Sequence, residues 1–218
     1  MLTSRERFEK TLNHQDPGKV VADLGATPIT GINANALVRL RKALGLEDRK
    51  IKICEPLQLL GLVEEDLLEA LQIDVVDVTN NYNIFGFENV GWKPWKLQSG
   101  LEVEVPENFN TSCDELGNTY LYPQGDMSVK PSGKMPKGGY YFDNIVRVSE
   151  EFDEDNADAQ HDFKDDFGVY TDHQLRNIEE RCNQLYNNTQ YGLIGGGALA
   201  GIGDFATLSG PGVKYPNG

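Results

Sequence analysis

Three polar side chains lie at or just beyond the ends of two predicted strands. Asp23 lies near the end of the apolar run 20–24, and Asn81 and Tyr82 follow the β-branched run 73–78. Ligands of parallel sheets and barrels bind at the carboxyl ends of the strands. A carboxylate there can act as a general acid or base, or bind an N–H group of a substrate. We therefore predict Asp23 and Asn81 as catalytic residues and Tyr82 as a substrate-binding residue.

Each of these assignments has a structural alternative. Asp23 could cap a helix or close a turn in the loop that follows it, because short acids bind nearby backbone N–H groups. Asn80 and Asn81 form a pair that is typical of turns, and such a turn needs no ligand. Either alternative would leave the two predicted catalytic side chains with a purely local role.

A glycine-rich segment follows a third predicted strand, 191–194. Gly195, Gly196 and Gly197 begin a match to G-x-G-x-x-A, which lets a backbone approach a pyrophosphate. No acid stands about 20 residues further on, where a dinucleotide-binding unit holds the ribose. We therefore predict these three glycines as a substrate-binding loop rather than a dinucleotide site.

The histidines and cysteines form no local metal-binding pattern. Three of each are scattered over the chain, with no Cys-x-x-Cys and no His-x-x-x-His. Cys54 follows a strand alone, and structural zinc takes four ligands. We expect no metal and no cofactor bound by this chain itself. An odd number of distant cysteines fits a reducing compartment, so we expect a cytoplasmic protein.

Predicted strands and helices alternate over both ends of the chain. The apolar spacing predicts helices over 3–14, 37–44, 57–72 and 172–187 and strands over 20–24, 51–54, 73–78 and 191–194. This alternation predicts an α/β fold with a parallel sheet. From 85 to 148 no helix is predicted, and short alternating runs separated by Gly and Pro indicate an antiparallel β-hairpin insertion.

The composition excludes several classes of protein. The net charge is −14 over 218 residues, which argues against a nucleic-acid partner because phosphate binding needs a basic face. No apolar run is long enough for a membrane helix, and the charged N-terminus is no secretory signal. Residues 150–166 carry nine acids and one lysine, which predicts a solvated surface or, as the alternative, a partner-docking segment.

Several segments taken together resemble the uroporphyrinogen decarboxylase-like superfamily. They are Thr3–Phe8 with Leu12–Pro17 and Val20–Asp23, then Leu71–Val76, Pro131–Asp143 and Leu193–Gly195. The segment Pro131–Asp143 is similar to the branch allied to corrinoid-dependent methyltransferases. The resemblance implies a (β/α)8 barrel of the TIM type, with its site at the carboxyl ends of the strands.

Two departures from the decarboxylase pattern favour the methyltransferase branch. Decarboxylases carry an Arg-Gln-Ala-Gly-Arg stretch where this chain has Leu24–Thr30, and an Asp where this chain has Asn81. The resemblance therefore implies methyl transfer between a small molecule and a corrinoid protein. Relatives of that branch bind zinc through a His-x-Cys and a distant Cys in their C-terminal half, and this chain has no such ligands.

We expect residues 1–218 to form one incomplete barrel domain, the N-terminal part of a longer protein. A barrel takes about 250 residues, and 85–148 are spent on the insertion. The leading hypothesis is a corrinoid-linked methyltransferase that uses zinc in the full-length protein. The alternatives are a porphyrinogen decarboxylase and a non-catalytic half-barrel that binds a partner chain. An unpaired strand edge near Ile194 would favour oligomers.

Overall fold

The computed structural model describes residues 2–78, 81–147, 155, 158–162, 170–195 and 210–215. The chain forms two compact units, each built from separate stretches of sequence. Unit 1 contains Met1–Ile51, Leu60–Asn80 and Tyr170–Leu199, and unit 2 contains Lys52–Leu59, Asn81–Val169 and Ala200–Gly218. The two units are described separately below.

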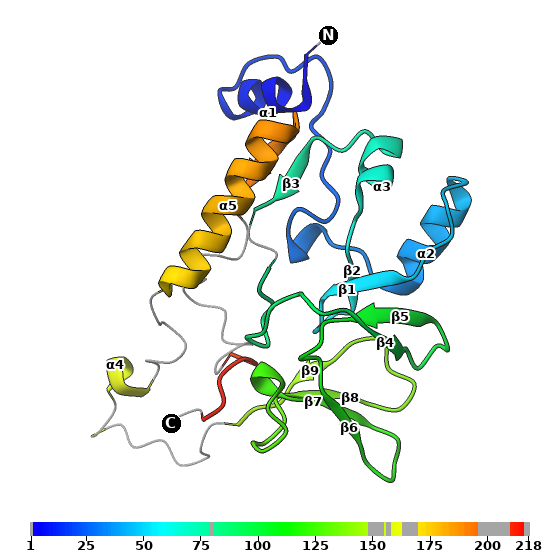
Figure 1. Ribbon diagram of the computed structural model, residues 1–218, viewed down its shortest axis with the longest axis vertical. Coiled ribbons are helices and arrows are strands. Elements are labelled where there is room, and N and C mark those ends of the chain that lie inside the picture. Colours follow the sequence, from blue (N-terminus) through cyan, green and yellow to red (C-terminus); the bar gives the residue numbers. More distant parts are fainter. Residues whose placement is uncertain are drawn as a thin grey trace. The chain divides into compact units, whose positions relative to one another are not determined.

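Unit 1 combines helices with a parallel pair of strands, as the alternation in the sequence predicts (Figure 1). Its elements are α1 (Ser4–Leu12), the 3-10 helix η1 (Pro28–Thr30), α2 (Ala34–Ala43), β2 (Leu60–Gly61), α3 (Glu65–Ala70), β3 (Val75–Asp77), α5 (Asp172–Asn188) and β10 (Gly192–Ile194). The strands β3 and β10 pair in parallel, with Val75 opposite Gly192 and Asp77 opposite Ile194. The α/β class is confirmed, and no closed barrel is seen in the described residues.

The helix boundaries follow local capping chemistry. Thr3 and Glu6 form a capping box at α1, and Thr171 and Gln174 form a second one at α5. Each box satisfies backbone N–H groups that the first helical turn leaves free. Gly45 follows α2 with φ of +69°, a left-handed conformation that costs glycine little. These ends agree with the predicted helices 3–14, 37–44 and 172–187.

The predicted strand 20–24 is not formed. The N–H of Ala22 donates to the side chain of Asp74 at 3.0 Å, and the carbonyl of Ala22 accepts from the N–H of Asp74 at 2.9 Å. One partner is thus a carboxylate rather than a backbone carbonyl, which interrupts the regular ladder. The segment still runs beside the start of β3, because Ala22 and Leu24 pack on the same core cluster as Val76.

The predicted helix 57–72 is also wrong over its first half, since α3 begins only at Glu65. The N–H of Gly61 donates to the carbonyl of Ile32 at 2.9 Å, and Leu60 forms an antiparallel bridge with Asn33. These partners hold Leu60 and Gly61 extended as β2. The apolar spacing therefore reflects burial in two different elements rather than one helical stripe.

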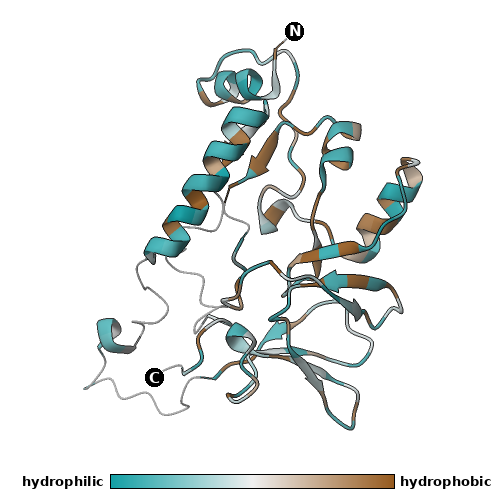
Figure 2. Ribbon diagram, in the orientation of Figure 1, coloured by the Kyte–Doolittle hydropathy of each residue, from teal (hydrophilic) through white to brown (hydrophobic). Residues whose placement is uncertain are grey.

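Asp74 is a buried group of unit 1 that contacts three separate parts of the chain. It is 0% exposed and accepts from Arg7 Nε at 3.0 Å and from the N–H of Ala22. Its carbonyl accepts from the N–H of Gly192 at 2.8 Å. Asp74 therefore joins α1, the segment 20–24 and the start of β10 to one position. Beside it, Leu68, Ile73 and Val76 form the buried cluster, and β3 is accordingly apolar in Figure 2.

Unit 2 is built from antiparallel strands, which confirms the predicted hairpins. Its strands are β1 (Ile51–Glu55, which starts at the unit boundary), β4 (Lys93–Lys96), β5 (Glu102–Val105), β6 (Thr111–Cys113), β7 (Thr119–Leu121), β8 (Gly133–Met135) and β9 (Asp143–Asn144). One sheet contains β1, β5 and β4 in that order, and the other runs β6-β7-β8-β9. The core holds Phe85, Phe109 and Phe142, each at most 2% exposed.

Two short helices complete unit 2. They are the 3-10 helix η2 (Pro123–Gly125) and α4 (Ala159–Asp162). Most of the acidic run 150–166 lies outside the described residues, so its predicted role stays a prediction. Among the helices that the structure describes, none has the length and apolar character required to cross a bilayer.

Replacement of Asp74 by asparagine should destabilise the protein by about 2–3 kcal/mol, because the Arg7 guanidinium then keeps no charged partner in a mostly buried position. The measurement is urea denaturation of the Asp74→Asn variant. Glu9→Gln, at an exposed position of α1, is the charge-matched control and should change the unfolding free energy little. Equal stability of the two variants would contradict the anchoring role of Asp74.

The same variant should also change the response to acid. Burial opposes ionisation of Asp74, but hydrogen bonds from Ala22, Arg7 and Ser4 and the Arg7 charge outweigh it and lower its pKa. A folded-state pKa below the unfolded value of about 3.9 adds stability above that value, and this is lost as the pH falls through the folded pKa. The unfolding free energy of Asp74→Asn should therefore fall less than that of the wild type between pH 5 and pH 2, measured by urea titrations.

Candidate functional site

The predicted residues Asn81 and Tyr82 belong to a closed polar loop of unit 2. Tyr82 and Glu88 form an antiparallel bridge, and the Tyr82 hydroxyl donates to Glu88 Oε1 at 2.6 Å. The N–H of Asn89 donates to the carbonyl of Asn81 at 2.8 Å, and Asn89 Nδ2 donates to the carbonyl of Cys54 at 2.8 Å. The loop is therefore a hydrogen-bonded hairpin, in line with the turn that the sequence offered as the alternative.

The Tyr82 hydroxyl stays protonated and keeps its hydrogen bond to Glu88. Burial, the hydrogen bond to Glu88 and the Glu88 charge together raise the pKa of Tyr82 to about 12. A phenol with such a pKa stays protonated at neutral pH, so it cannot serve as a general base there. Its chemical role is to donate a hydrogen bond, and in this structure Glu88 receives it.

Asp23 lies in unit 1 and forms a local contact. Its Oδ1 accepts from the N–H of Ala26 at 3.1 Å, which is the turn role given above as the alternative to catalysis. Because Asp23 belongs to unit 1 and Asn81 to unit 2, the hypothesis that both face one cavity stays a prediction. Gly195 is exposed after β10, whereas Gly196 and Gly197 lie outside the described residues.

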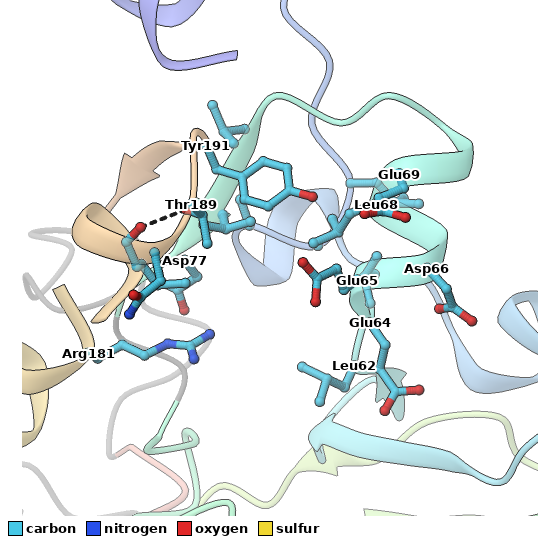
Figure 3. Close-up of a pocket in the computed structure, with 18 of the residues that line it drawn as sticks. Leu62, Glu64, Glu65, Asp66, Leu68, Glu69, Asp77, Arg181, Thr189 and Tyr191 are labelled. Carbon is cyan, nitrogen blue, oxygen red and sulfur yellow. Dashed lines mark hydrogen bonds between the residues drawn. The ribbon is translucent and has the colours of Figure 1, made fainter. Parts of the chain in front are cut away.

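A cavity of about 860 Å³ lies within unit 1 (Figure 3). Its apolar surface comes from the core cluster, including Leu68, Val76 and Leu185. Asp77, at the carboxyl end of β3, also borders it and is 8% exposed. None of the predicted site residues Asp23, Asn81 and Tyr82 is among those that line this cavity.

Acidic side chains from α3 form one wall of the cavity, and two of them are already neutralised. Arg41 binds both carboxylate oxygens of Asp66, at 2.9 and 2.7 Å. Arg49 lies 3.2 Å from Glu64 and 3.1 Å from Asp66. These ion pairs use the carboxylates that point toward α2 and the segment preceding β1. Asp66 consequently has a lowered pKa, caused first by its hydrogen bond from Arg41.

The other two acids of α3 act on the cavity itself. Burial and the charges of Glu65 and Glu69 raise the pKa of Tyr191, which lies just before β10. Glu65 and Glu69 are four residues apart, so they lie on one face of the helix. This i, i+4 spacing of acids is the signal that could have revealed the wall from the sequence.

A guanidinium from α5 enters the same cavity from the other side. Figure 3 shows Arg181 reaching into the open space that Glu65 borders from α3. Arg181 Nε is buried and has no hydrogen-bond partner in the described part of the chain. No ion pair among the described residues uses the Arg181 guanidinium, so its charge is available to an anion in the cavity.

The described residues do not fit the zinc that the family resemblance implies. No three of the described His, Cys, Asp and Glu side chains are grouped so that they could hold a metal ion. Cys54, Cys113 and Cys182 form no disulfide with one another. We therefore derive no catalytic step through a metal from the geometry of this chain.

Titration of the tyrosines tests the Tyr82–Glu88 pair. Among the nine tyrosines of the chain, Tyr82 should ionise with a pKa of about 12. Tyr82→Phe should therefore remove absorbance change at the alkaline end of an ultraviolet pH titration. Glu88→Gln should instead shift that component toward lower pH, because the carboxylate charge is gone. An unchanged alkaline end in both variants would contradict the pair.

Comparison of the chain with protein-family models, with curated proteins and with solved structures returns no significant match. The function is therefore argued from the sequence and the geometry alone.

Proposed function

We propose that this chain is the N-terminal part of a (β/α)8-barrel enzyme related to the uroporphyrinogen decarboxylase-like superfamily. In this proposal the enzyme moves a methyl group between a small molecule and a corrinoid protein. The observation that supports the barrel is that β3 lies between the segment that precedes it, 20–24, and the parallel strand that follows it, β10. The preceding segment is hydrogen-bonded to Asp74, and β10, the next parallel strand, pairs along β3. A singly wound barrel needs consecutive parallel strands as neighbours.

The place of the hairpins gives further support. The antiparallel strands β4–β9 lie in sequence between β3 and β10, so the connection between two parallel strands carries the insertion. The segment Pro131–Asp143, which is similar to the methyltransferase branch, contains β8 of that insertion. The methyl-transfer assignment itself depends on the sequence resemblance and on the missing Arg-rich stretch after Leu24.

In this proposal Asp23 supplies the acid at the carboxyl end of the first strand segment. One of its oxygens is held by the N–H of Ala26, which would fix the carboxylate for a substrate N–H group or for proton transfer. Zinc would be held by residues of the full-length protein that are not in this chain, and the corrinoid would be brought by a partner protein.

The test uses the gene product that contains this chain, with methylcobalamin as methyl donor and 2-mercaptoethanol as acceptor. The expected result is formation of the methyl thioether with equimolar loss of methylcobalamin, measured by mass spectrometry and absorbance. Asp23→Asn keeps an oxygen for the N–H of Ala26 but removes the charge. We expect it to lower kcat about 100-fold, the scale of a lost acid–base group.

Glu179→Gln is the matched control, because Glu179 is exposed on α5 and does not line the cavity. It should transfer methyl groups at the wild-type rate. Formation of coproporphyrinogen from uroporphyrinogen would identify a decarboxylase instead. Absence of both activities, with stable binding of a second protein chain, would favour the non-catalytic half-barrel.

A further inference from the structure

Opposite charges face one another across the cavity of unit 1. Arg181 enters from α5 with its Nε buried and unpartnered in the described part of the chain, and Glu65 enters from α3 (Figure 3). Glu69 stands one turn further along α3 and borders the same space. No ion pair joins Arg181 to either acid among the described residues. The cavity thus keeps the two charged walls apart, and a ligand with two charged ends could join them.

The acids at and near the start of α3 fall into two groups, those that are ion-paired and those that are not. Glu64 and Asp66 are committed to Arg49 and Arg41 through ion pairs of 2.7–3.2 Å. Glu65 and Glu69 lie on the cavity side and affect Tyr191, whose pKa is raised by burial and by these two carboxylates. The negative charges of Glu65 and Glu69 are therefore available to a ligand, whereas those of Glu64 and Asp66 are paired with arginines.

The remaining surface of the cavity favours an organic cation beside these acids. The aromatic ring of Tyr191 and the side chains of Leu68 and Leu185 supply apolar contact for a hydrocarbon chain. A volume of about 860 Å³ lies within the usual range for small-molecule sites.

We propose that this cavity binds a small zwitterion in which a hydrocarbon spacer joins a carboxylate to an ammonium group. The carboxylate pairs with the Arg181 guanidinium, and the ammonium group pairs with Glu65 and Glu69. The spacer lies on the apolar floor between the two walls. This proposal does not depend on methyl transfer, because it concerns a cavity lined entirely by unit 1.

The test is a calorimetric titration of the 218-residue chain with a series of unbranched ω-amino acids, from glycine to 6-aminohexanoate. The members of the series differ in the distance between their ammonium and carboxylate groups. The member whose distance matches that between Arg181 and the two acids should bind best. The amine and the carboxylic acid of the same length each lack one charge. We expect each to bind at least tenfold more weakly than the zwitterion.

Two variants assign the ends of the ligand. Arg181→Gln should abolish the preference for the zwitterion over the matched amine. The double variant Glu65→Gln, Glu69→Gln should abolish the preference over the matched carboxylic acid. Arg176→Gln and Glu179→Gln, at exposed positions of α5 outside the cavity, are the controls and should bind as the wild type does.

Three results would overturn the proposal. The first is the absence of binding by every member of the series in the wild-type chain up to about 10 mM, a very weak affinity. The second is equal affinity for the zwitterion and its singly charged analogues. The third is wild-type binding by Arg181→Gln. A wild-type chain that binds the zwitterion but shows no methyl transfer would separate this site from the proposed function.

Discussion

The carboxylate of Asp74 is the constraint on which the architecture of unit 1 depends. A fully buried charge is stable only if it is paired and hydrogen-bonded, and Asp74 draws its partners from α1 and from the segment before η1. The backbone of the same residue reaches Ala22 and Gly192. Three distant parts of the sequence are therefore positioned by one residue, and the parallel pair β3–β10 begins where they meet.

A second set of ions orients α3 and thereby determines the character of the cavity. Arg41 is only 3% exposed and holds Asp66 through two hydrogen bonds. Fork-like binding of this kind restrains rotation of the helix as well as its position. Arg41 and Arg49 hold Asp66, whereas Glu65 and Glu69 border the cavity four residues apart on α3. The ion pairs at Asp66 thus leave Glu65 and Glu69 as the acids of the cavity wall that no ion pair of the described residues uses.

The sequence was sufficient for elements whose signals are local. The capping boxes at Thr3 and Thr171, the glycine after α2 and the alternating residues of β5 all act within a few positions. The two errors, at 20–24 and 57–64, have a common cause. There the backbone partners are distant residues, Asp74 in one case and Ile32 in the other. Tertiary partners of this kind override local propensity.

The candidate site was predictable only in part for the same reason. Asn81 and Tyr82 could be selected because the strand β3 before them is visible in the sequence, whereas Asp23 was selected from the segment 20–24, which forms no strand. Arg181 could not, since its helix reads as an ordinary amphipathic one and its cavity neighbours come from residues more than one hundred positions earlier. Its unpaired Nε is a property of the packed structure, not of any motif.

The long connection between β3 and β10 also affects how the protein emerges from the ribosome. β3 ends at Asp77 and its only paired strand in the described residues begins at Gly192, 115 residues later. At about 5–20 residues per second, the apolar edge of β3 waits roughly 6 to 23 s for its partner. Unit 2 has a similar delay, because Arg147 donates to the carbonyls of Gly210 and Val213. During synthesis both units therefore expose unfinished surfaces that chaperones would recognise.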